Sequence, residues 1–114
     1  MLGTYRFVTS ELSCNGLLRR YRTERTDDGV SGDENLFAPC SFWAAEYLAN
    51  CGRRDAARLR FERLLGCAND LGLYAEEIVA DTHEPIGNFP QAFTHVSMIA
   101  CSHRPTISSD VPEL

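Results

Sequence analysis

The sequence contains no lysine, so all eleven of its basic residues are arginines. Sixteen Asp and Glu residues outweigh them, and the formal net charge at pH 7 is −5. A protein that binds nucleic acid through the phosphate backbone needs a basic footprint. The acidic balance therefore argues against nucleic acid as a partner.

Positive charge gathers in one segment near the N-terminus. Its four arginines and the three acids that dilute them are Arg19, Arg20, Arg22, Arg25, Glu24, Asp27 and Asp28. Such a cluster can grip an anion or a nucleic acid, or it can be an ordinary solvated segment with one functional arginine. The interleaved acids favour the solvated segment.

Long apolar runs and paired metal ligands are also missing. No run approaches the roughly 18 residues that a membrane span requires, and no basic-then-apolar leader opens the chain. The five cysteines form no C-x-x-C pair, and the three histidines show no H-x-x-x-H spacing. These absences argue against a membrane span, a zinc or other metal site, and a disulfide scaffold, and we expect no cofactor. We expect a protein of the reducing cytoplasm.

What remains is a chain of 114 residues with helical periodicity, long enough for one domain. Turn and cap signals predict helices over about 5–12, 39–51, 55–71 and 88–99. The short turn at Gly52 predicts that the second and third helices form an antiparallel pair. We expect an all-α domain over 1–99, long loops without secondary structure at 23–37 and 73–87, and an irregular tail over 100–114.

The apolar spacing also predicts which helix faces are buried. The helix over 55–71 is expected to begin with Asp55 as its cap and to turn a stripe from Ala57 to Leu71 inward. The last helix is expected to face inward with four apolar residues: Phe89, Phe93, Val96 and Ala100.

The second long loop carries the adjacent acids Glu76 and Glu77. Neighbouring residues point in different directions, so the two cannot form a facing carboxylate pair by themselves. From the residues alone, one of them can be a catalytic carboxylate, or both can be solvated loop acids.

Several segments resemble bacterial glycoside hydrolase family fifteen proteins, the glucoamylase-like and trehalase-like enzymes. The segments are C-S-F-W, F-E-R-L-L, A-N-D-L-G-L and G-N-F-P-Q-A-F, in family order between about residues 17 and 99. The resemblance implies a C-terminal segment of an (α/α)6 toroid of antiparallel helix pairs. It also implies an inverting enzyme that acts on α-glucosidic bonds.

The resemblance assigns roles to individual residues. Glu76, preceded by Ala75, matches the family's general base, and Glu77 is left without an assigned role. Arg20 and Tyr21 match an Arg-Tyr step that contacts sugar hydroxyls, and Glu34 matches a pocket-lining glutamate. Three aromatic residues can line the sugar or belong to the core, and the core role is favoured for each: Phe37, Trp43 and Phe93.

The resemblance marks no general acid in this chain. An inverting site needs one about 6.5–9.5 Å from the base, and no motif assigns that role to Glu34, Asp81 or Glu84. We therefore expect no hydrolysis by the chain alone. One hypothesis is that it supplies the general base to a site for an α-linked glucose oligosaccharide or trehalose, completed by an upstream half. The alternative is a noncatalytic helical remnant or interaction domain. In both cases exposed apolar faces make self-association possible.

Overall fold

The computed structural model describes residues 1–25 and 35–104. Its helices are α1 (Leu2–Leu12), α2 (Ala38–Asn50), α3 (Arg54–Leu65) and α4 (Ala92–Ser102), with a 3-10 turn η1 (Thr23–Arg25). Its strands are β1 (Ser13–Cys14), β2 (Leu17–Leu18), β3 (Leu36–Phe37), β4 (Glu77–Ile78) and β5 (Pro85–Ile86). The helix-rich architecture confirms the predicted all-α class, because each strand has only two residues.

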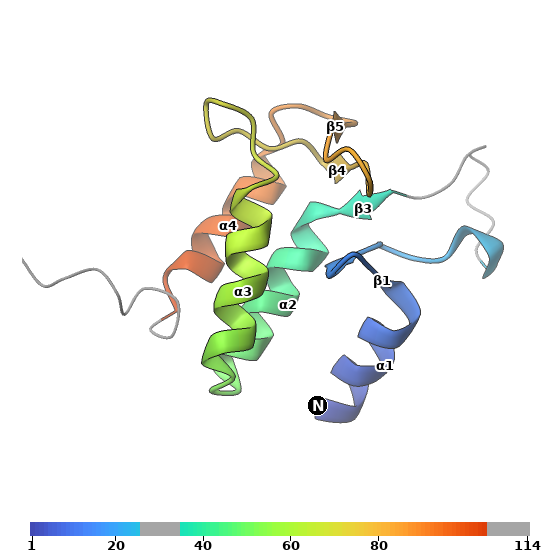
Figure 1. Ribbon diagram of the computed structural model, residues 1–114, viewed down its shortest axis with the longest axis vertical. Coiled ribbons are helices and arrows are strands. Elements are labelled where there is room, and N and C mark those ends of the chain that lie inside the picture. The colour runs from blue at the N-terminus through green and yellow to red at the C-terminus, as the bar shows by residue number, and fades with distance from the viewer. Residues whose placement is uncertain (26–34, 105–114) are drawn as a thin grey trace, which may run out of the picture.

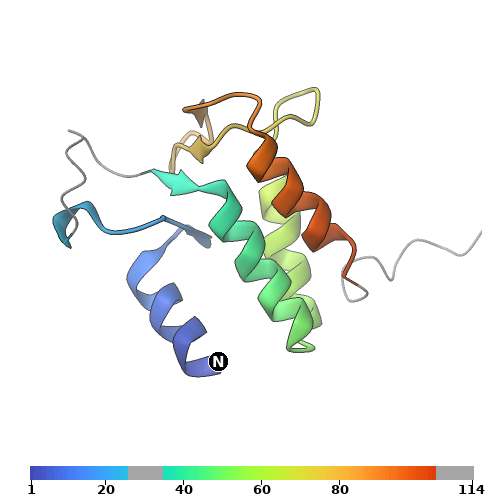
Figure 2. The same ribbon diagram turned by 180° about the vertical axis from the view of Figure 1, so that it is seen from behind.

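Helix α2 is the centre of the molecule. It packs against α3 on one side and α4 on another, and α1 contacts it through Tyr5, whose ring stacks on Tyr47 at a centroid distance of 4.9 Å (Figures 1 and 2). Pro39 lies in the first turn of α2, where its missing N–H leaves no helical bond unmade. Gly52 ends the helix with a φ of +73°, a left-handed conformation that glycine adopts without strain. The predicted antiparallel α2–α3 pair is thereby confirmed.

The core lies where α2, α3 and the strands meet. The Phe42 ring is fully buried and meets the edges of Phe61, at a centroid distance of 6.0 Å, and Tyr74, at 5.5 Å. Leu36 and Ile78 face each other across the β3–β4 ladder, and both are buried. These contacts fix the strands to the end of the helix pair by apolar burial.

The prediction of a loop without secondary structure at 73–87 is wrong. Strands β4 and β5 form a hairpin there, and β3 adds to it from a distant part of the chain to give an antiparallel sheet in the order β3-β4-β5. Part of the other predicted loop, 26–34, lies outside the described residues. The described ends of that loop form η1 and β3.

Helix α3 ends six residues before the predicted boundary at Leu71, whose side chain is 76% exposed. The Asn69 side-chain oxygen accepts hydrogen bonds from the backbone N–H groups of Leu71 and Leu73, at 3.0 and 2.8 Å. Such a turn competes with helix formation. The expected cap is also wrong: Arg53 holds the N-cap position, and Asp55 lies inside the first turn.

Helix α4 buries a different face from the one predicted. Its buried residues are Thr94, Ser97 and Cys101, whereas Phe93 is 49% and Val96 62% exposed. Small side chains let α4 approach α2 closely. The hydroxyl groups find carbonyl acceptors, Ala75 O for Thr94 and Phe93 O for Ser97, so their burial costs little. The helix also continues to Ser102, three residues past the expected boundary at Ile99.

Candidate functional site

The junction of β3 and α2 supports the backbone of Glu76. The first N–H of α2, from Ala38, donates to the carbonyl of Glu76 at 3.2 Å. The N–H of Glu76 in turn donates to the carbonyl of Asn88 at 3.0 Å. The peptide groups on both sides of the Glu76 Cα are therefore held by segments that approach from opposite directions.

Three further hydrogen bonds tie the residues before Glu76 to α4. The Gln91 N–H donates to Tyr74 O at 2.9 Å, the Thr94 hydroxyl donates to Ala75 O at 3.0 Å, and the Tyr74 N–H donates to Nε2 of His95 at 3.2 Å. An Nε2 that accepts leaves the imidazole proton on Nδ1, which lies 2.6 Å from Gln91 O. The start of α4 thus acts as a clamp on this segment.

Tyr74 anchors the same segment to the core. Its ring is buried, and its hydroxyl donates to the carbonyl of Leu64 at 2.9 Å. Burial raises the pKa of Tyr74 to about 12, and the neighbouring Cys67 thiol adds to the shift. The phenol therefore stays protonated and keeps its hydrogen bond at neutral pH.

The Glu76 side chain lies against Gly87. A Cβ added at Gly87 would come within 3.2 Å of Oε2 of Glu76, and Gly87 has a φ of +80°. Glycine is therefore required here both for the backbone conformation and for the space that Glu76 fills. Within residues 1–25 and 35–104, the Glu76 carboxylate has no hydrogen-bond or ion-pair partner. Its oxygens are available to accept a proton or a hydrogen bond from a ligand.

The sheet register brings Glu77 opposite Phe37. Phe37 is buried, which confirms its core role. The Arg20 guanidinium carbon lies 5.1 Å from the Phe37 ring centroid and 4.9 Å from that of Tyr21, whose hydroxyl accepts from Nη2 of Arg20 at 3.4 Å. The structure thus brings Arg20 and Tyr21 to Phe37, whose strand pairs with the one that follows Glu76.

Two of the remaining candidates, Asp81 and Glu84, lie away from Glu76. Glu34 falls outside the described residues. Asp81 and Glu84 are exposed near the tip of the β4–β5 hairpin, whereas Glu76 precedes β4 at the open end. Three residues of extended chain, about 10 Å, separate Glu76 from Val79, which hydrogen-bonds to Glu84. No ion pair or hydrogen bond joins these acids to Glu76 in the described part of the chain.

Two of the aromatic residues are not core residues. Trp43 is 43% and Phe93 49% exposed, and their rings meet edge to face at a centroid distance of 5.4 Å. The core role favoured for them by the sequence is therefore wrong. They lie side by side on exposed parts of α2 and α4.

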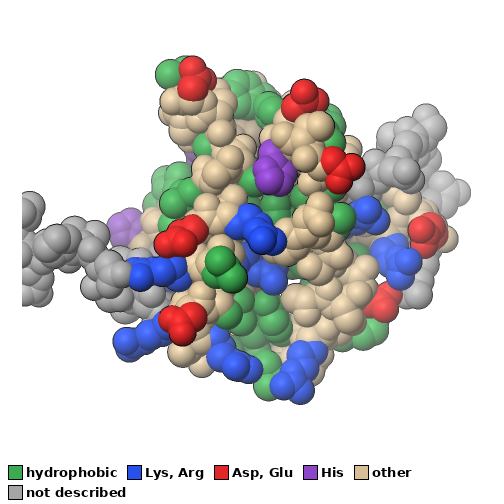
Figure 3. Space-filling view, in the orientation of Figure 1, with side chains coloured by type: hydrophobic (Ala, Val, Ile, Leu, Met, Phe, Trp, Pro, Cys, Tyr) green, Lys and Arg blue, Asp and Glu red, His purple; other side chains and the backbone are tan. Residues whose placement is uncertain are grey.

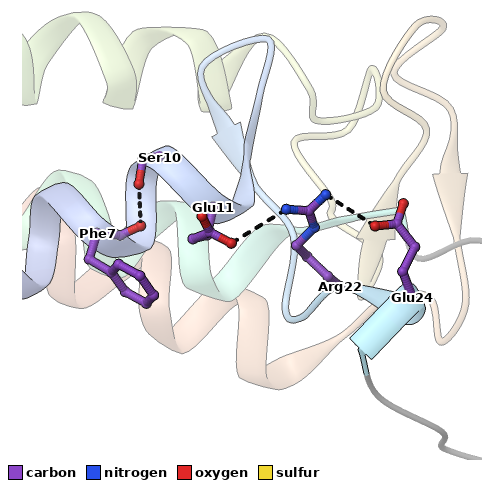
Figure 4. Close-up of polar contacts among 5 residues, drawn as sticks. All are labelled: Phe7, Ser10, Glu11, Arg22 and Glu24. Atoms are coloured by element: carbon purple, nitrogen blue, oxygen red, sulfur yellow. Dashed lines mark hydrogen bonds and ion pairs between the residues drawn. The ribbon is translucent and has the colours of Figure 1, made fainter.

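One arginine of the cluster, Arg22, forms ion pairs with two acids. Arg22 bridges two carboxylates, Glu11 at 3.4 Å and Glu24 at 3.1 Å, and so ties the segment after β2 to the end of α1 (Figure 4). Figure 4 also shows the hydroxyl of Ser10 bonded to the Phe7 carbonyl within α1. Arg22 thus has a structural role.

Two kinds of site have no support in the described ranges. No group of three His, Cys, Asp or Glu side chains in them could hold a metal ion. None of their helices is long and apolar enough to cross a lipid bilayer.

Comparison with known proteins gives a family match for the segment that contains Glu76. The model of the glycosyl hydrolases family 15 matches residues 55–103. The chain is 49% identical over 92 residues to the trehalase of Mycolicibacterium smegmatis and 48% identical over 92 residues to that of Mycobacterium tuberculosis. Each match covers 81% of this chain and 14% of the relative. Residues 55–103 thus match glycosyl hydrolase family 15, and most of the chain is similar to trehalases.

The chain is also similar to a trehalase from a third genus. The trehalase of Thermoplasma acidophilum is 44% identical over 99 residues, which cover 86% of this chain and 16% of the relative. No solved structure gave a significant match. The chain thus spans about a seventh of the length of the trehalases it resembles.

The family 15 segment contains nearly all of α3 and the whole of β4, β5 and α4, and therefore both Glu76 and the residues that clamp it. Family 15 has an (α/α)6 fold. Sequence reasoning missed Gly87, Thr94 and His95 as supports of Glu76. The only local signal was their position in and just after the G-N-F-P-Q-A-F stretch.

Proposed function

We propose that this chain forms one wall of the substrate site of a trehalase-type inverting glycosidase, with Glu76 as general base. One observation carries the proposal. In a segment that matches family 15 and resembles trehalases, the Glu76 backbone is bonded on both sides while its carboxylate has no protein partner among the described residues. A rigid backbone with an unpaired carboxylate suits a base that must orient a water molecule.

In the proposed reaction, Glu76 takes a proton from water as the water attacks the anomeric carbon. The bond from that carbon to the leaving oxygen breaks on the opposite face, and a second carboxylic acid protonates the oxygen. We propose that this acid lies in the part of the enzyme outside these 114 residues. Asp81 and Glu84, at the far end of the hairpin, are poorly arranged for the role.

Arg20 and Tyr21 are proposed to contact sugar hydroxyls beside Glu76. The cation–π contacts with Phe37 and Tyr21 hold the guanidinium in one orientation, so its N–H groups are ordered before a sugar binds. Glu34 is proposed as a further contact to the sugar. The substrate is proposed to be trehalose or another α-linked glucoside.

The exposed apolar residues of α4 fit the same proposal. Phe93, Val96 and Ile99 are about half or more exposed and belong to one helix. We propose that neighbouring helices of the complete toroid cover them. All five cysteines are free, which is consistent with a protein that works in the cytoplasm.

A chimeric enzyme tests the proposal. The aligned 92 residues of this chain replace their counterpart in the Mycolicibacterium smegmatis trehalase, and glucose release from trehalose is measured. We expect the chimera to hydrolyse trehalose and the isolated chain to release none. A folded chimera that releases no glucose would contradict the proposal.

The noncatalytic interaction domain is a second candidate, because the apolar face of α4 would also suit a protein partner. The two candidates differ in what the chimera does. An interaction domain has no reason to restore trehalose hydrolysis inside a trehalase, whereas a catalytic wall with the correct base does.

A further inference from the structure

A pocket of about 380 Å³ lies between α1 and α3, away from Glu76. Three arginines line it, Arg53, Arg60 and Arg63, together with apolar groups from Leu48 and Leu59. Figure 3 shows basic side chains around an apolar hollow beside α3. No acidic side chain of the described residues lines this pocket. The three guanidinium groups therefore face this pocket with no carboxylate from the described part of the chain in its lining.

The spacing of the arginines puts them on one face of α3. Arg60 and Arg63 are three residues apart, and Arg53 lies seven residues before Arg60, at the helix N-cap. Positions separated by three or seven residues are neighbours along one side of a helix. Like charges in such an arrangement repel one another unless an anion compensates them.

Of the three arginines, Arg60 has a buried N–H donor that lacks an acceptor among the described residues. Its Nη1 atom is buried and has no hydrogen-bond partner in the described structure. Buried donors are nearly always satisfied, and an unsatisfied one invites an explanation. An oxyanion in the pocket would supply the acceptor that the Arg60 guanidinium lacks.

Arg63 is held in position by the turn between β1 and β2. Its Nη1 donates to the carbonyl of Asn15 at 2.5 Å, in space that opens because Gly16 has no side chain. A Cβ at Gly16 would come within 2.2 Å of that nitrogen, and Gly16 has a φ of +80°. The turn therefore fixes one guanidinium at the rim of the pocket.

We propose that this pocket binds a small phosphate-bearing anion. Planar guanidinium groups bind phosphate oxygens through paired charge-assisted hydrogen bonds, and three of them match a multiply charged oxyanion better than a single carboxylate. The volume lies in the lower range of small-molecule sites, and the net charge of −5 disfavours a polyanion. The ligand is free phosphate or a small phosphate monoester, and Arg53, Arg60 and Arg63 contact its oxygens.

Calorimetric titration of the full chain tests this site. The probes are inorganic phosphate and a sugar phosphate, with sodium chloride at matched ionic strength as reference. We expect saturable binding of at least one phosphate probe. Tighter binding of the sugar phosphate identifies an organic monoester as the ligand class, and equal binding identifies free phosphate.

Point variants distinguish phosphate binding in the pocket from a general effect of net charge. Arg60→Met is expected to weaken binding about 10- to 100-fold, the value of hydrogen bonds to a charged group. Arg53→Gln, at an exposed helix start, should weaken it without affecting the fold. Arg54→Gln removes the same charge from the next position, outside the pocket, and should leave affinity within about twofold. Absence of saturable binding, or equal losses in Arg53→Gln and Arg54→Gln, would overturn the proposal.

Discussion

Replacing Gly87 with alanine should separate the backbone role of this glycine from its contact with Glu76. Gly87 and Gly72 have nearly the same left-handed φ, +80° and +76°. An added Cβ at Gly87 would lie 3.2 Å from Oε2 and 3.4 Å from Cβ of Glu76, whereas at Gly72 it would meet nothing within 4 Å. Gly72→Ala is therefore a matched control for the backbone cost.

The stability loss should be the same in both variants. Alanine in the left-handed region costs about 1–2 kcal/mol, and reduced freedom of the unfolded chain offsets about 0.4–1 kcal/mol of it. Urea unfolding of the isolated chains should show a net loss of about 1 kcal/mol for each.

Catalysis should differ between the two. The tight contact at Gly87 obliges Glu76 to shift by a few tenths of an ångström. A misplacement of 1 Å can cost about 100-fold in rate, so we expect kcat of the chimera to fall roughly 3- to 10-fold in Gly87→Ala and to stay unchanged in Gly72→Ala. Equal kcat values in the two variants would refute the argument that Gly87 positions Glu76.

Three other substitutions test the support of the site and the exposed face. Thr94→Val leaves the buried carbonyl of Ala75 without its donor, so urea unfolding should show a loss of about 1–3 kcal/mol, and an unchanged midpoint would contradict this. Because the pKa of Tyr74 rises from 10.0 to about 12 on folding, the unfolded phenol ionises first, and the free energy of unfolding should fall by up to about 2.7 kcal/mol between pH 10 and 12. Tyr74→Phe should remove that part of the alkaline loss, and an unaltered pH profile would argue against it. Phe93→Ser should reduce self-association in sedimentation velocity, whereas Leu71→Ser, an equally drastic change at another exposed position, should not.

Local signals in the sequence predicted helix ends well where a proline or a glycine restricts the backbone. Pro39 and Gly52 bounded α2 correctly, because each restricts the backbone regardless of tertiary contacts. The end of α3 was missed because the helix stops at Gly66, and the Asn69 side chain then holds a turn by accepting from the N–H groups of Leu71 and Leu73. The apolar stripe gave no warning of this competition.

The features that the sequence did not predict depend on tertiary contacts. The pairing of Leu36 with Ile78 joins segments about forty residues apart, and strands of two residues carry no periodicity to detect. The buried face of α4 was mispredicted because Thr94 and Ser97 satisfy their hydroxyls internally, which hydropathy does not register. For the candidate site, resemblance selected Glu76, and local chemistry alone could not have separated it from Glu77.

Replacing Glu76 with glutamine in the chimeric trehalase tests the central claim most directly. The change keeps the shape of the side chain and removes its basicity, while Glu77→Gln makes the same change at the next residue. We predict that Glu76→Gln lowers kcat for trehalose by about 10²- to 10⁴-fold, the usual contribution of a positioned base, with the circular dichroism spectrum unchanged. We predict a far smaller loss for Glu77→Gln. Turnover of the Glu76→Gln chimera at the level of the parent chimera would contradict the assignment of Glu76 as the general base.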